Sequence, residues 1–144
     1  MEKEKNETNK ETIIYFPQGI PGFEEYKRYV IYLSEEFSPF KILKSIDNDE
    51  LNVKFIIVET NLIKPDYKIE LTDLDREDLR YEDGDVVQDF FIVTIDPKNY
   101  KNSYINLMGP LVINFTKELG KQLIIDRYIE QPLYYFLKEE ENSK

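Results

Sequence analysis

The sequence contains no histidine and no cysteine. It therefore cannot form the Ser-His or Cys-His arrangements of nucleophilic catalysis, a zinc site with imidazole or thiolate ligands, or a disulfide. Histidine is also the commonest general base near neutral pH. Carboxylates, lysines, tyrosines and a few serines remain for chemistry. No set of them stands out as a catalytic group or as a cofactor site.

Glycine is scarce as well. The five glycines lie at positions 19, 22, 84, 109 and 120, and none belongs to a phosphate-binding loop of either common type. A pair of carboxylates could still hydrolyse a glycosidic bond, but acidic residues this abundant lie near one another by chance. We expect a protein without catalytic activity, and a carboxylate-based hydrolase is the alternative.

The chain has no long hydrophobic run. One of the longest uninterrupted apolar stretches covers residues 90–93, far short of the ~20 residues that cross a bilayer. The charged N-terminus has no apolar region behind it, so we expect no signal peptide. The absence of cysteine suits a reducing compartment. The cytoplasm is the expected location.

Negative charge dominates the composition. There are 29 acidic and 19 basic residues, which gives a net charge of −10 and a sequence pI of about 4.6. Such a field repels nucleic acids and anionic membranes and attracts basic partners. The charge fits a protein that binds basic proteins, including a generic acidic adaptor. It is equally compatible with acidity that only maintains solubility.

The length and composition predict one domain. The chain has 144 residues, 41% of them hydrophobic and 14% aromatic, which is enough for a core. Residues 1–11 are almost entirely polar or charged, and we expect a disordered tail there because they have little apolar surface to bury. The β domain should cover residues 12–138, with a polar tail at 139–144. We expect a monomer when no partner is bound.

Short segments rich in β-branched and aromatic residues predict strands. At this regular spacing, with little helical periodicity, they indicate an all-β fold: a single antiparallel β-barrel or sandwich-like domain with one or two short helices. The expected strands cover residues 13–16, 29–33, 40–46, 53–58, 67–71, 86–95, 105–107, 111–115 and 122–126. A helix is also expected near the C-terminus, with Pro132 in its first turn.

The densest acidic stretch lies between Thr72 and Asp85. It lacks the spacing of a calcium-binding loop, so we expect no metal there. Thr72 is a suitable N-cap for a short helix, and Asp83 with Gly84 predicts a turn before the next strand. The stretch is also the candidate surface for attracting a basic partner, through Asp73, Asp75, Asp78, Glu82, Asp83 and Asp85.

Several segments occur in an order that resembles the FliW family over residues 13–128. They are residues 16–24, 39–45, 65–67, 93–95, 105–114 and 120–123. The ordered set ends in an Asn-Leu-x-x-Pro motif at residues 106–110 and a Gly-x-Gln motif at residues 120–122. Lys44 and Gly109 depart from the family pattern, which usually has glutamine and alanine at these positions.

The resemblance implies a flagellar assembly factor with two protein partners. FliW proteins hold flagellin in the cytoplasm before export. When free of flagellin, they bind the translational regulator CsrA at a site away from its RNA surface and relieve the repression of flagellin translation. No direct contact with nucleic acid or membrane is implied.

The family motifs supply further candidate partner-binding residues: Asn106, Leu107, Pro110 and Gln122. Each also has a structural interpretation. Pro110 interrupts a strand, and the amides of Asn106 and Gln122 can satisfy buried backbone groups instead of contacting a partner.

Overall fold

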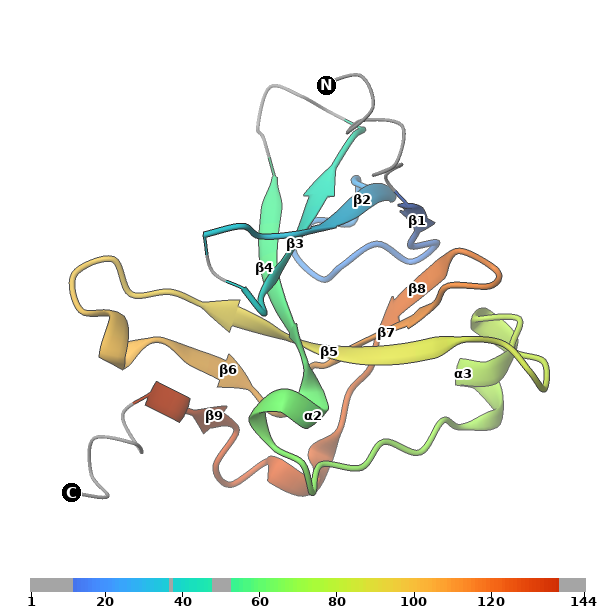
Figure 1. The fold of residues 1–144 in the computed structure, drawn as a ribbon. Helices are drawn as coiled ribbons and strands as arrows, with labels where there is room; N and C mark the ends of the chain where they lie inside the picture. The colour runs from blue at the N-terminus through green and yellow to red at the C-terminus, as the bar shows by residue number, and fades with distance from the viewer. Residues whose placement is uncertain (1–11, 37, 48–52, 138–144) are drawn as a thin grey trace.

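The computed structural model describes residues 12–36, 38–47 and 53–137. The tails predicted at residues 1–11 and 139–144 lie outside these ranges. Within them the chain is mostly β, as the sequence predicts, with nine strands in one sheet and two short α-helices. Figure 1 shows β5 crossing the middle of the molecule, with α2 and α3 beside it.

The strands close into a seven-stranded barrel. Their order is β4-β3-β2-β1-β8-β7-β5, and β5 pairs back to β4, while β6 and β9 extend the sheet from β5. The β1–β8 pairing, at Tyr15 and Leu119, is parallel, and the other pairings are antiparallel. The bounds are β1 Thr12–Tyr15, β2 Arg28–Leu33, β3 Lys41–Ser45, β4 Lys54–Glu59, β5 Val87–Thr94, β6 Tyr104–Asn106, β7 Leu111–Asn114, β8 Leu119–Gln122 and β9 Leu133–Tyr134.

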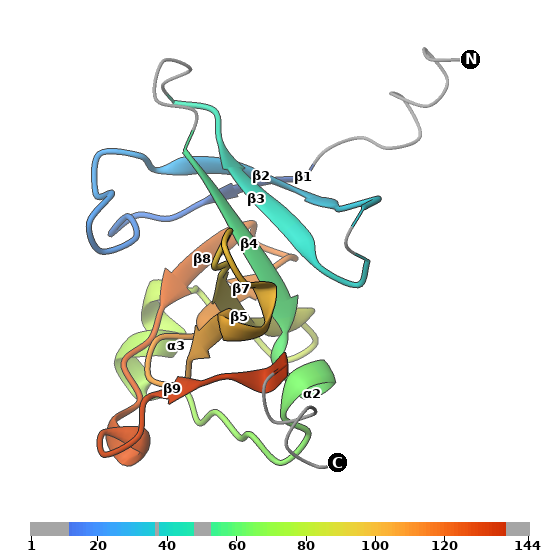
Figure 2. The same cartoon turned by 90° about the vertical axis from the view of Figure 1, so that its left-hand side faces the viewer.

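Alternation along β5 explains why its apolar run is continuous. Phe90 packs into the barrel core, and Phe91, one residue on, packs into a second apolar cluster on the outside. Both faces of this strand are therefore covered, so both carry apolar side chains. A strand with one face in solvent would instead alternate apolar and polar residues. Figure 2 shows β1, β2 and β3 as an upper layer, with β4 running down from them toward β5.

Close packing between β1 and β8 depends on Gly120. A Cβ atom at this position would lie 2.5 Å from the Phe16 ring, and Phe16 is completely buried in the barrel core. The ring therefore occupies the space that a side chain on β8 would need. Gly120 itself lies inside β8.

Two predicted strands and one predicted helix differ from the structure. Residues 67–71 alternate buried and exposed side chains as a strand would, but no other strand pairs with them. The last predicted strand, 122–126, is displaced, because β8 already ends at Gln122. The segment after Pro132 forms β9, which pairs with β6 in place of the expected helix start.

The short helices connect strands on the outside of the barrel. Helix α2 (Thr60–Ile63) follows β4 directly, and α3 (Asp73–Asp78) lies beside the β7–β8 hairpin (Figure 1). Two 3-10 turns lie between the later strands: η1 (Tyr100–Asn102) precedes β6, and η2 (Asp126–Tyr128) precedes β9. A third apolar cluster, centred on Leu79, Val112 and Leu123, packs on the outer face of β7.

Candidate partner-binding surfaces

The acidic stretch begins with a capped helix, as the sequence predicts. The Thr72 hydroxyl accepts a hydrogen bond from the Asp75 backbone N–H (3.1 Å), and the Asp75 carboxylate accepts one from the Thr72 N–H (3.0 Å). This reciprocal capping box satisfies two N–H groups that a helix start leaves unpaired. Asp75 therefore serves the helix itself.

A single lysine fixes α3 to the β7–β8 hairpin. The Nζ atom of Lys121 lies 2.7 Å from Asp75 and 2.6 Å from Asp78. Burial acts to raise the pKa of Asp75, but hydrogen bonds from Lys121 and Thr72 outweigh it and lower the pKa below the usual value. These two carboxylates bind their own chain.

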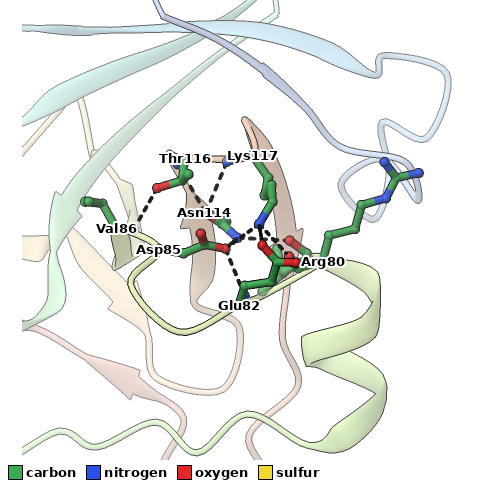
Figure 3. A network of polar contacts seen from close by, with 8 residues as sticks. Arg80, Glu82, Asp85, Val86, Asn114, Thr116 and Lys117 are labelled. Atoms are coloured by element: carbon green, nitrogen blue, oxygen red, sulfur yellow. Dashed lines mark hydrogen bonds and ion pairs between the residues drawn. The ribbon is translucent and has the colours of Figure 1, made fainter.

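A second lysine holds the turn that follows α3. The Nζ atom of Lys117 lies 2.9 Å from Asp85 and 3.1 Å from Glu82, and the Asn114 amide donates to Asp85 as well (Figure 3). The hydrogen bonds from Lys117 and Asn114 and from the Glu82 N–H lower the pKa of Asp85 to about 2. The Asp85 side chain is only 6% exposed.

Four of the six acidic candidates thus form ion pairs with two lysines, Lys121 of β8 and Lys117 of the hairpin turn, which offset half of their negative charge. The other two, Asp73 and Asp83, are exposed and have no ion pair within the described ranges. Lys117 and Lys121 are distant in sequence, so the acidic stretch alone does not reveal these pairs. The charge that remains for attracting a partner is smaller than the sequence suggests.

The four family-motif candidates lie together around the β6–β7 connection. Leu107 and Pro110 are buried, and Asn106 is exposed. The Asn106 side-chain oxygen accepts a hydrogen bond from the Met108 N–H (2.9 Å), and the Gln122 amide donates to the Gly109 carbonyl oxygen (2.9 Å). Both amides brace the loop, and Asn106 is the most exposed member of this group, while Gln122 is half-buried.

Gly109 and Gln122 fit each other closely. A Cβ atom at position 109 would lie 2.7 Å from the Gln122 amide nitrogen. Because the obstacle is the end of a flexible side chain, an alanine here would displace the amide without moving the backbone. The glycine allows Gln122 to reach the carbonyl oxygen beside it.

One cleft was not anticipated from the sequence. It has a volume of about 540 Å³ and lies between the outer face of β5–β7 and the segment that joins α2 to α3. Asp89, Glu70 and Arg76 supply its charged groups, above an apolar floor that includes Val87 and Val112. The available signal was Asp89 itself, a carboxylate inside the most apolar strand of the sequence.

No group of three or more carboxylates is placed to hold a metal ion within the part of the chain that the structure describes. The helices in that part are too short or too polar to cross a bilayer. Each carboxyl group there whose pKa is clearly shifted has a lowered pKa: Glu24, Asp47, Asp75 and Asp85. A general acid at neutral pH needs the opposite shift.

Comparison with known proteins gives one consistent result. The model of the FliW protein family matches residues 2–135. The flagellar assembly factor FliW of Alkaliphilus metalliredigens is 39% identical over 134 residues, which cover 92% of this chain and 81% of that protein. The flagellar assembly factor FliW of Caldicellulosiruptor saccharolyticus is 39% identical over 139 residues, which cover 95% and 87%.

The fold agrees with a solved structure as well. A crystal structure of the flagellar assembly factor FliW superposes with a TM-score of 0.70. The match covers 81% of this chain and 79% of the other, at 36% sequence identity.

Proposed function

This chain belongs to the FliW family, and from that premise we propose that it is a cytoplasmic flagellar assembly factor that works by binding two proteins in turn. It holds flagellin before export. When free of flagellin it binds CsrA at a site away from the RNA surface of CsrA, and flagellin translation resumes. The family match over nearly the whole chain carries this proposal.

The charge of the chain supports a basic partner. With a net charge of −10, the protein adds a negative field beside any RNA-binding protein that it contacts. That field weakens the affinity of the partner for RNA by repulsion without covering the RNA site. No direct contact with nucleic acid or membrane is required.

We also propose that the protein has no catalytic activity. The residue types that remain for catalysis are chiefly carboxylates, and those with shifted pKa values are shifted toward the ionised form. A carboxylate-based hydrolase would need one carboxyl group that stays protonated at neutral pH. Protein binding is therefore favoured over hydrolysis.

Calorimetric titration of the full-length protein with purified CsrA and, separately, with purified flagellin tests the proposal. We expect saturable binding of each partner, and weaker binding of CsrA as salt rises. If neither protein binds, this proposal is wrong, and the alternative is a generic acidic adaptor that binds another protein.

A further inference from the structure

Asp89 differs from four of the five other partly buried aspartates of the described ranges, and Asp96 is the exception. Asp47, Asp75, Asp78 and Asp85 each form an ion pair with a lysine or arginine. Asp89 accepts a hydrogen bond from the hydroxyl of the buried Thr60, but no cation of the described residues forms an ion pair with it. A partly desolvated carboxylate without a cation is a favourable site for one supplied from outside.

The cleft around Asp89 fits a long basic side chain. Val87 and Val112 form an apolar floor, on which the methylene groups of a lysine or arginine can pack while the charged end stays at the rim. Glu70 adds a second carboxylate and Arg76 a single cation, so the formal charge of the lining is −1. The cleft therefore favours a cation over an anion.

The backbone beside Asp89 has an open edge. Strand β4 accompanies β5 as far as the pair Glu59–Phe90 and then turns into α2 at Thr60. On the other side, β7 continues along β5 to Val87. Among the described residues no strand covers the β4 side of Val87 and Gln88. Unpaired strand edges of this kind accept an additional strand from a partner.

The opposite wall of the cleft is held in place. The Tyr67 hydroxyl donates to the Leu107 carbonyl oxygen, and the Tyr67 ring stacks on Tyr128 at 5.5 Å. The Arg127 guanidinium lies over both rings and donates to the Lys68 carbonyl oxygen. Segment 67–71 is therefore fixed beside β5 without pairing with it, and the space between them is preformed.

We propose that this cleft receives an extended segment of a partner protein that carries a lysine or arginine. The cation pairs with Asp89, its aliphatic stem packs on Val87 and Val112, and the partner backbone runs along the open edge of β5. This inference rests on the proposed protein-binding function and assigns it a surface.

Nuclear magnetic resonance of the ¹⁵N-labelled full-length protein tests the site directly. The probe is an acetylated and amidated five-residue peptide of alternating valine and lysine, and its control has glutamate in place of lysine. We expect the lysine peptide to shift the amide signals of Val87, Gln88 and Asp89, and the glutamate peptide to leave them unchanged. Equal binding of both peptides, or shifts confined to another surface, would overturn the proposal.

Three variants, each of which removes one negative charge, test which carboxylate binds the lysine of the peptide. Asp89→Asn keeps an acceptor for Thr60 and should weaken binding of the lysine peptide about tenfold. Glu70→Gln, at an exposed position that tolerates the change, should weaken it about two- to threefold. Asp83→Asn makes the same change in net charge outside the cleft and should have no effect. The site is wrong if Asp83→Asn weakens binding as much as Asp89→Asn does.

The same variants separate this proposal from the broader function. If CsrA and flagellin both bind Asp89→Asn as tightly as the unaltered protein, the cleft is not their docking site, although the protein-binding function stands. If neither CsrA nor flagellin binds the unaltered protein, the broader function fails. The peptide titration then remains as the test of the cleft as a binding site. Loss of one partner with Asp89→Asn, but not with Asp83→Asn, supports the assignment.

Discussion

At the scale of single residues, two glycines face different obstacles. A Cβ atom at Gly120 would meet the buried Phe16 ring at 2.5 Å, whereas at Gly109 it would meet the mobile end of Gln122 at 2.7 Å. We predict that Gly120→Ala destabilises the protein by about 2–3 kcal/mol through overpacking. Gly109→Ala should cost about 1 kcal/mol, the value of the hydrogen bond that Gln122 loses. Urea unfolding of both variants measures the difference, and equal costs would contradict it.

Two buried tyrosines make a second residue-scale contrast. The Tyr29 hydroxyl has no hydrogen-bond partner among the described residues, and burial, followed by the nearby Asp47 carboxylate, raises the pKa of Tyr29 to about 12. The Tyr67 hydroxyl donates to Leu107. Tyr29→Phe should therefore leave stability unchanged or raise it, while Tyr67→Phe should lower it by about 1–2 kcal/mol. Thermal unfolding that ranks the two variants the other way would refute this assignment.

At the scale of elements, Lys121 fixes α3 to the barrel. It contacts two carboxylates, and its side chain is only 15% exposed. We predict that Lys121→Met costs about 1–2 kcal/mol, between the values of exposed and buried ion pairs, and speeds amide exchange in α3. Lys41→Met is the control, since Lys41 makes one longer contact of 3.6 Å to Glu59. Unchanged exchange in α3 would show that the helix is held by its apolar contacts alone.

The Lys117–Asp85 pair gives the α3 turn a pH dependence. Because the pKa of Asp85 is lowered to about 2, the stability that it contributes is complete above its ordinary pKa of about 3.9 and disappears as pH falls through 2. The stability difference between the unaltered protein and Lys117→Met should therefore shrink between about pH 4 and pH 2. Denaturant unfolding at several pH values measures it, and a constant difference would exclude this pair as the cause.

The sequence predicts most elements because each strand carries its own pattern, as residues 111–115 do for β7. The prediction fails where the local pattern does not reveal whether another strand lies beside the segment in the fold. Residues 67–71 alternate like a strand, yet α2 carries the chain away from the sheet edge and leaves them unpaired. The acidic candidates were misleading for a similar reason. Their lysine partners, Lys117 and Lys121, follow them by 32 to 46 residues, a separation that local patterns do not record.

At the scale of the whole molecule, charge should set the rate at which CsrA is bound. Asp73 and Asp83 are exposed and have no ion pair among the described residues, so they are the acidic candidates best placed to act at a distance. Changing both to asparagine should slow association with CsrA about two- to threefold at low salt and have little effect near 0.5 M salt. Stopped-flow kinetics measure this, and an equal slowing at both salt concentrations would point to direct contact instead of long-range attraction.

The central claim is that flagellin and CsrA exclude each other on this protein. A standard interface buries about 800 Å² on each partner, so a domain of 144 residues has room for few of them. The direct measurement is to titrate flagellin into a preformed complex of this protein with labelled CsrA and follow the release of CsrA. We predict that CsrA leaves in proportion to the flagellin bound, until none remains. A stable complex of all three proteins at saturating flagellin would contradict the account.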